Sequence, residues 1–189
     1  SENRSRLDIN VSQTESLLND LRKRRYDMVF CSYSSSARDI AFIPVLELPF
    51  VVAMPAEDPL ATCDAIEPEQ LRNRAMVFNA EPIYSSLIQR IFDHYHITPI
   101  VRGSSNEDSV LLRMVADGVG LLISTDHIQM HTEETALRPL RQDAYHRYIY
   151  LAYLPEAIHS PAAEQVIEFA KQHALEEKGL QPKAADRLK

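Results

Sequence analysis

Residues 104–124, SSNEDSVLLRMVADGVGLLIS, hold the pattern that decides the fold. The apolar residues of the first half recur at the three- and four-residue spacing of one helix face, and they are Val110, Leu111, Met114 and Val115. Asn106 or Asp108 can cap the start of this helix, and Gly118 can end it. The apolar run over residues 120–124 then predicts a buried strand. A helix that leads directly into a buried strand indicates an α/β layer.

The segments upstream repeat the same alternation of strand and helix. Residues 75–78 and 97–101 predict two strands, and the apolar spacing over residues 83–94 predicts a helix between them. Strands that alternate with helices in this way are typical of sheets with parallel strands. We therefore expect residues 50–141 to form one α/β lobe.

The amino-terminal segment predicts a strand, a helix and a second strand. Apolar and polar residues alternate over residues 7–11, which is the period of a strand with one buried face. Ser12 and Glu15 have the spacing of a capping box, which predicts that a helix begins here. The basic cluster at residues 22–25 falls at the end of this helix, where cations complement the helix dipole, so we prefer that role to a nucleic-acid contact. Residues 28–31 then predict a buried strand.

Both ends of the chain are expected to share one lobe. Residues 145–153 predict a strand, and Ser160 with Pro161 predicts the start of a helix, but no partner strand lies nearby in the sequence. The simplest solution pairs this strand with the amino-terminal strands. The expected boundaries are residues 1–47 with 146–189 for the first lobe, 50–141 for the second, and crossovers near 46–50 and 142–148.

The composition is that of an acidic globular protein. The net charge is −7 and the sequence pI is near 5.5, so we expect this chain by itself to bind DNA poorly, since DNA binding needs a basic face. The apolar runs are far shorter than the roughly 20 residues of a membrane helix, and no export signal is visible at the start. We therefore expect no membrane segment and a cytoplasmic location. Cys31 and Cys63 have no motif spacing and are expected to be free thiols.

Four passages of the chain together resemble the carboxy-terminal, effector-binding domain of LysR-type transcription regulators. They are LDINVSQTESLLNDLRKRRYDMVF (7–30), FIPVLELPFVVAMPAEDPLA (42–61), SSNEDSVLLRMVADGVGLLIS (104–124) and LAYLPEAIHSPAAEQVIEFAKQHA (151–174). The matching positions include Asp27 of the family's leucine-aspartate strand, the Asp58-Pro59-Leu60 loop, and Val115, Gly118, Gly120 and Leu121 of its V-x-x-G-x-G-I motif. No single passage is specific, but their order and spacing are.

The resemblance implies a two-lobed α/β fold of the type II periplasmic-binding-protein kind, in which each lobe is a mixed sheet flanked by helices. It also implies that a small effector binds between the lobes to control transcription, and that the chain assembles as a homodimer or tetramer. Promoter DNA would be contacted only through a helix-turn-helix domain that is absent from this chain. The family domain opens with one more strand and helix before Leu7, so we expect the first lobe to lack them.

Polar residues at strand ends and helix starts are the candidates for effector binding. Helix N-termini offer N–H groups and the positive end of the helix dipole, which suit a carboxylate or another small anion. The candidates are Ser34, Ser35, Pro82, Ile83, Tyr84, Ser85, Ser104, Ser105, Asn106, Ser124 and Thr125. The alternative for each of them is ordinary helix capping or turn formation.

Other chemistries have little support in the sequence. His127 and His131 have the spacing of paired metal ligands on a helix, but there is no H-E-x-x-H motif and no third ligand is identifiable, so we predict no metal. The chain has no nucleophile elbow, Walker loop or dinucleotide fingerprint, so we predict neither an enzyme nor a cofactor. The alternative function is a transport-type solute-binding protein on the same fold.

Overall fold

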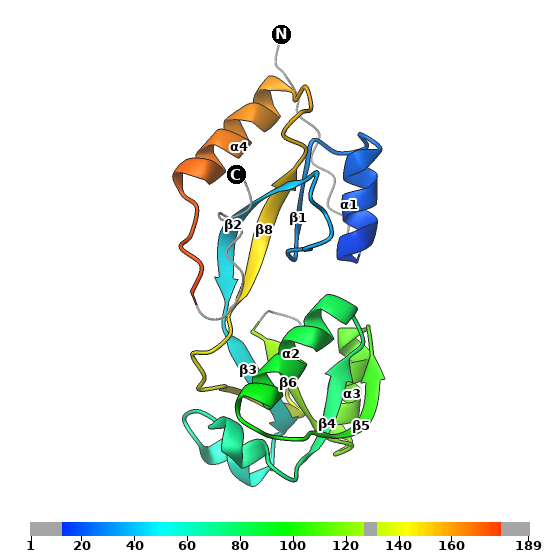
Figure 1. Cartoon of the computed structure of the whole chain (residues 1–189). Helices are drawn as coiled ribbons and strands as arrows, with labels where there is room; N and C mark the ends of the chain where they lie inside the picture. The colour runs from blue at the N-terminus through cyan, green and yellow to red at the C-terminus, as the bar shows by residue number, and fades with distance from the viewer. Residues whose placement is uncertain (1–12, 127–131, 179–189) are drawn as a thin grey trace. The chain divides into compact units, whose positions relative to one another are not determined.

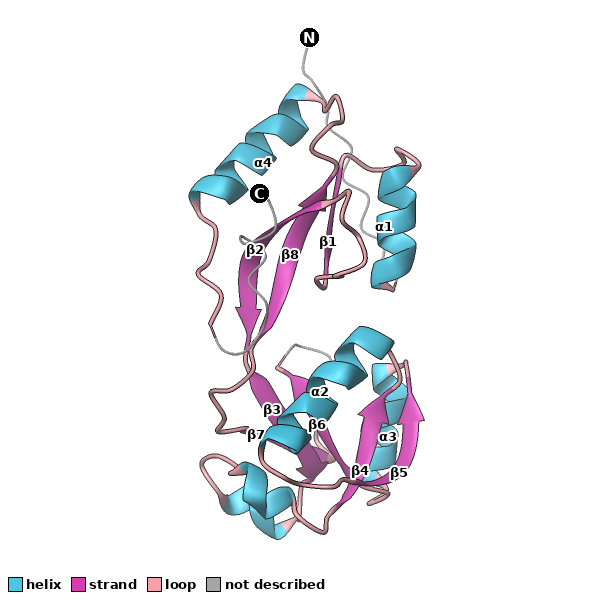
Figure 2. Ribbon diagram, in the orientation of Figure 1, coloured by secondary structure: helices cyan, strands magenta, loops and turns pink. Residues whose placement is uncertain are grey.

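The computed structural model describes residues 13–126 and 132–178 (Figure 1). Within these residues the chain divides into two compact units. Unit 1 combines the residues up to Glu47 with Tyr148–Glu177, and unit 2 consists mainly of Leu48–Arg147. Each unit is a sheet with helices packed against it (Figure 2). The fold is thus the expected α/β class with two lobes. The strand expected at residues 7–11 lies outside the described residues.

Unit 1 is built on a three-stranded sheet from both ends of the chain. Its strands are β1 (Met28–Cys31), β2 (Ala41–Leu48) and β8 (Arg147–Tyr153), in the order β1-β8-β2. The pairing of β1 with β8 is antiparallel and aligns Met28 with Tyr153. The late strand therefore lies in the middle of the sheet, between the two early ones.

The two helices of unit 1 cover opposite faces of this sheet (Figure 1). α1 (Thr14–Arg22) shares one core with Tyr150 and Ala152 of β8, whereas α4 (Pro161–Gln172) shares another core with Leu151. This division follows from the pleat of β8, because neighbouring strand residues point to opposite faces. α4 begins where the sequence predicted, with the Ser160 hydroxyl accepting the amide hydrogen of Ala163 at 3.3 Å.

The start of α1 differs from the predicted capping box. Its N-cap is Gln13, which makes no side-chain cap hydrogen bond, and Ser12 lies outside the described residues. The carboxylate of Glu15 instead accepts a hydrogen bond from the hydroxyl of Ser34 at 2.8 Å. The carboxylate of Glu15 thus contacts a loop that is distant in the sequence.

The last described residues pack along the sheet of unit 1. The amide of Leu175 donates to the carbonyl of Pro44 at 2.9 Å, and the buried hydroxyl of Tyr150 donates to the carboxylate of Glu177. These two contacts hold the segment after α4 against β2 and β8.

Unit 2 is a mixed five-stranded sheet in the order β5-β4-β6-β3-β7. β4 pairs in parallel with β5 and with β6, and β3 pairs antiparallel with β6 and with β7. The strands are β3 (Phe50–Pro55), β4 (Ala75–Asn79), β5 (Ile100–Ser105), β6 (Leu121–Thr125) and β7 (Thr135–Pro139). The sequence patterns did not predict β7. Two 3-10 helices, Pro59–Thr62 and Pro68–Leu71, follow β3.

Two α-helices cover the faces of the unit 2 sheet. α2 (Pro82–His94) contributes Ile88, Ile91 and Phe92 to the larger core, and α3 (Asp108–Ala116) packs Leu111, Leu112 and Val115 on the other face. Adjacent residues of β6 divide between the two cores, as the alternation of a strand requires: Leu121 and Ile123 belong to the larger core and Leu122 to the other.

Two glycines join α3 to β6, and each has a different physical role. Gly118 has φ 72°, a left-handed conformation that ends the helix. Gly120 lies against β4, where an added Cβ would come within 2.9 Å of backbone atoms of Ala75 and Met76. The glycine spacing seen in the sequence therefore reflects first a helix end and then a close approach of two strands.

We expect Gly120→Ala to lower the free energy of unfolding by about 1–3 kcal/mol, because the added methyl meets backbone that has to move. Gly103→Ala is the matched control, since its added Cβ meets only the flexible end of Met114. Urea unfolding of both variants tests this. Equal losses for the two variants would contradict the explanation from strand proximity.

The strand predicted at residues 97–101 is displaced, and β5 runs from Ile100 to Ser105 instead. Ile97 is buried and belongs to the end of α2: its amide donates to the carbonyl of Phe92 at 2.9 Å, and that of His96 donates to Asp93 at 3.1 Å. This pair of bonds is the Schellman motif. His96 takes the left-handed position with φ 52°. The apolar Ile97 thus packs at the end of a helix. In the sequence, an apolar residue at this position looks like the first residue of a strand.

We expect His96→Gly to raise the free energy of unfolding by about 1 kcal/mol, because glycine adopts the left-handed conformation without steric cost. The side chain of His96 is exposed, and its carbonyl can keep the hydrogen bond from Arg72. Gly118→Ala, with the opposite change at the equivalent position of α3, should lose a similar amount. Thermal unfolding compares the stability of the two variants. A destabilised His96→Gly variant would contradict the claim that the left-handed conformation of His96 has a steric cost.

Candidate functional site

The carboxyl ends of three parallel strands define one edge of the unit 2 sheet. Asn79, the last residue of β4, is paired with Ser105, the last residue of β5, and β6 ends beside β4 at Thr125. α2 begins three residues after β4, and α3 begins three residues after β5. Ligands commonly bind at such an edge of an open α/β sheet. Nine of the predicted site residues lie here, namely Pro82, Ile83, Tyr84, Ser85, Ser104, Ser105, Asn106, Ser124 and Thr125.

Tyr84, in the first turn of α2, has a buried hydroxyl at this edge. The residue is only 5% exposed, and its hydroxyl has no hydrogen bond of good geometry among the described residues. Burial raises the pKa of this phenol to about 12, although the nearby hydroxyl groups of Ser124 and Thr125 and the charge of Arg147 act in the opposite direction. Ser124 and Thr125 are themselves buried. A buried hydroxyl without a well-placed partner costs free energy, so it indicates a site for a ligand or water.

Arg147 supplies the cation of the site, and the sequence did not nominate it. Its guanidinium carbon lies 4.6 Å from the centre of the Tyr84 ring, a cation–π contact. Its Nε is buried and has no hydrogen-bond partner among residues 13–126 and 132–178. Burial lowers the pKa of the guanidinium, while Tyr84, Glu81 and Asp108 raise it. An arginine stays protonated in proteins, so a positive charge with unused donor capacity lies beside Tyr84.

The N-terminus of α2 is already partly occupied. Glu81 is the N-cap, and its carboxylate accepts the amide hydrogen of Tyr84 at 2.7 Å. The carbonyl of Glu81 accepts from Ser85, and Pro82 has no amide hydrogen to donate. The N-terminus of α2 therefore has fewer N–H groups available to an anion than the sequence suggested. The charge of Arg147 is the stronger attraction for an anion.

The residues around the start of α3 serve local turns in part. The Ser105 hydroxyl accepts the amide hydrogen of Glu107 at 3.1 Å, and the Ser105 carbonyl accepts that of Ala80 at 2.9 Å. The N-cap of α3 is Glu107, so neither Asn106 nor Asp108 caps the helix as predicted. The hydroxyl of Ser105 thus bonds the amide of the N-cap residue itself. Ser104 and Asn106 are exposed.

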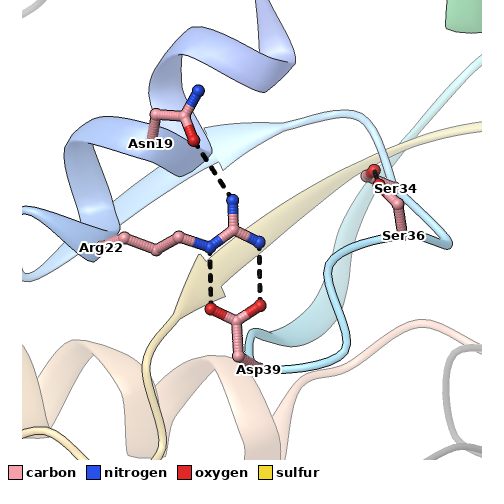
Figure 3. Close-up of polar contacts among 5 residues, drawn as sticks. All are labelled: Asn19, Arg22, Ser34, Ser36 and Asp39. Atoms are coloured by element: carbon pink, nitrogen blue, oxygen red, sulfur yellow. Dashed lines mark hydrogen bonds and ion pairs between the residues drawn. The ribbon is translucent and has the colours of Figure 1, made fainter.

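The two candidates in unit 1, Ser34 and Ser35, belong to a different part of the fold. The buried Ser34 hydroxyl bonds Glu15 and lies 2.9 Å from that of Ser36, and Ser35 is exposed. Figure 3 shows how Arg22 of α1 also holds this loop, with two 2.8 Å hydrogen bonds to the Asp39 carboxylate. The Ser34 hydroxyl thus contacts the side chains of Glu15 and Ser36, and its role in effector binding stays a prediction.

Neither a cluster of metal-ligand residues nor a membrane-crossing helix is found in the described part of the chain. There, no three His, Cys, Asp or Glu side chains group as metal ligands. His127 and His131 lie outside the described residues. Within the described ranges, no helix combines the length and apolar character that crossing a bilayer demands.

Comparison with known proteins places this architecture in the class of two-lobed α/β effector-binding domains. The effector-binding domain of QuiR, solved in complex with shikimate, matches with a TM-score of 0.75 and 26% identity, over 87% of this chain and 81% of that one. The BenM effector-binding domain, solved with benzoate, matches with a TM-score of 0.71 and 18% identity, over 91% and 82%. At that identity, the BenM match shows the fold alone.

The family model for the LysR substrate binding domain matches residues 3–175, so the chain belongs to this family. The HTH-type transcriptional regulator XapR of Escherichia coli (strain K12) is 33% identical over 99 residues, which cover 51% of this chain and about a third (33%) of the length of XapR. Membership of a family of regulatory domains favours the sensing interpretation over the solute-binding-protein and enzyme alternatives.

We expect Tyr84→Phe to leave the free energy of unfolding at neutral pH unchanged or to raise it by up to about 1 kcal/mol, since the hydroxyl is buried without a good partner. Its pKa is raised from 10.0 to about 12, so the unfolded state ionises first as the pH rises. The wild-type protein should therefore lose stability between about pH 10 and 12, and the variant should lose less. Chemical unfolding at several pH values measures both. A clear loss of stability at neutral pH would show that the hydroxyl is satisfied within the protein.

Proposed function

We propose that this chain is the effector-sensing part of a LysR-type transcription regulator, and that it binds a small carboxylate or other anion at the carboxyl edge of the unit 2 sheet. The observation that carries the proposal is the guanidinium of Arg147 over the ring of Tyr84, whose buried hydroxyl has no well-placed partner in the part of the chain that the structure describes. The shikimate bound by QuiR, a carboxylate, supports the same class of ligand.

The proposed contacts are of two kinds, an electrostatic attraction and a set of hydrogen bonds. Arg147 attracts the anion with donors in a rigid planar arrangement that suits a carboxylate. The hydroxyl groups of Tyr84, Ser124 and Thr125 can donate or accept and so fix the orientation of the ligand. The neighbouring candidates, from Pro82 to Ser85 and from Ser104 to Asn106, complete the edge of the proposed site. Ser34 and Ser35 of unit 1 remain predicted effector contacts that no observation here supports.

Regulation requires that the effector prefer one conformation of the full-length protein over another. In this proposal the sensing domain acts in the cytoplasm and is joined to a helix-turn-helix domain, which contacts promoter DNA. The name of XapR, an HTH-type transcriptional regulator, supports this arrangement. Assembly as a homodimer or tetramer stays a prediction from the family resemblance, and sedimentation analysis of the purified chain tests it.

Binding is tested by calorimetric titration with small carboxylates that include shikimate and benzoate, each compared with its neutral amide. We expect at least one carboxylate to bind and its amide to bind about tenfold or more weakly, because the amide lacks the charge that Arg147 pairs with. Equal affinity for each acid and its amide would contradict the proposal of an anion-binding site.

We expect Arg147→Met to weaken binding of that carboxylate by about tenfold to a hundredfold while the chain stays folded, since methionine fills similar space without a buried charge. Arg141→Met is the matched control: Arg141 is exposed and forms an ion pair with Glu67 at 2.9 Å. Titration of both variants, with thermal unfolding to check folding, separates the two roles. If the Arg141 change weakens binding as much as the Arg147 change, the assignment of Arg147 is wrong.

A further inference from the structure

The surroundings of Tyr84 contain two carboxylates as well as the guanidinium of Arg147. Glu81 is the N-cap of α2, one turn before Tyr84, and Asp108 is the first residue of α3. Because β4 and β5 are parallel neighbours, these two helix starts lie at the same edge of the sheet. The negative charges of Glu81 and Asp108 both act on Arg147, and that of Asp108 also acts on Tyr84.

This arrangement places one positive charge against two negative charges. Both acids are at helix N-termini, Glu81 as the N-cap of α2 and Asp108 in the first turn of α3. A ligand with only a carboxylate would add a third negative charge, of which Arg147 can offset one. Repulsion of like charges in a partly buried site is costly, so a simple carboxylate fits the site poorly.

A ligand that also donates hydrogen bonds resolves this conflict. An ionised carboxylate accepts through two oxygens, and Glu81 uses one of them for the amide of Tyr84. A hydroxyl or ammonium group on the ligand can donate to the carboxylates of Glu81 and Asp108. The buried Tyr84 hydroxyl, only 5% exposed and without a good partner, is available to either kind of group.

We propose that the effector is a hydroxy or amino carboxylate, whose acid group is bound by Arg147 and whose hydroxyl or ammonium donors are bound by Asp108, Glu81 and the hydroxyl of Tyr84. This inference rests on the proposed function and narrows its ligand class. Asp108 is then the residue that determines specificity, because a carboxylate accepts hydrogen bonds and so attracts a ligand that carries a donor.

The test is calorimetric titration with matched ligands that differ only in their donors. Cyclohex-1-enecarboxylate is compared with shikimate, and propionate with lactate and with alanine. We expect the ligand with donors to bind about tenfold or more tightly in at least one set, which corresponds to one or two charge-assisted hydrogen bonds.

Asp108→Asn tests the specificity residue directly. We expect this change to reduce the preference for the ligand with donors about tenfold. The control, Asp117→Asn at the other end of α3, removes an exposed ion pair with Arg113 and should leave the preference unchanged. Thermal unfolding without ligand checks that both variants fold. If Asp108→Asn does not fold, the comparison of ligands on the wild-type chain still tests the proposed ligand class.

The outcomes separate the two proposals. If the simple carboxylates bind as tightly as their hydroxy or amino counterparts, the proposed hydroxy or amino carboxylate class is wrong. The proposed anion site is then still supported. If no carboxylate in any set binds, both proposals are overturned. An unchanged preference in a folded Asp108→Asn variant would remove Asp108 from the site while the ligand class stays supported.

Discussion

Parallel pairing of β4 with β5 and with β6 is the constraint on which the candidate site depends. It aligns the ends of three strands at one edge, and the two helices that follow β4 and β5 must begin there. The pairing with β6 requires Gly120, because any side chain at that position would meet the backbone of β4. A packing requirement between two backbones thus brings Tyr84, Ser124 and Thr125 together from separate segments of the chain.

The sequence predicts the helices and the central strands of unit 2 well, because each of them has a periodic apolar pattern that its burial requires. It fails where a residue acts through a contact made elsewhere. Ile97 was assigned to a strand, although its apolar side chain closes the end of α2. β7 was missed because its only buried residue is Thr135, so it has no apolar pattern to detect. Tertiary pairing with β3, rather than local preference, makes this segment a strand.

The residues of the candidate site also differ in whether local sequence patterns or tertiary contacts reveal them. Nine of the eleven predicted residues lie at one sheet edge, since strand ends and helix starts can be located from local patterns. Arg147 was not predicted, because its role depends on the ring of Tyr84, which is far away in the sequence. The capping carboxylate of Glu81 was also missed, and it reduces the attraction of the helix end for an anion. Local patterns can thus locate the edge, but its charges are set by the fold.

The middle position of β8 in unit 1 constrains the order in which the chain can fold. A ribosome delivers β1 and β2 long before β8, and among the described strands each of the two pairs within its sheet only with β8. The strands and helices of unit 2 all lie within Leu48–Arg147. The amide of Leu140 donates to the carbonyl of Phe50 at 3.0 Å, so folding of this segment shortens the loop that β8 must close to reach β2. The sheet of unit 1 can thus form only after unit 2 has been synthesised, and until then the edges of β1 and β2 that pair with β8 are open to pairing with other chains.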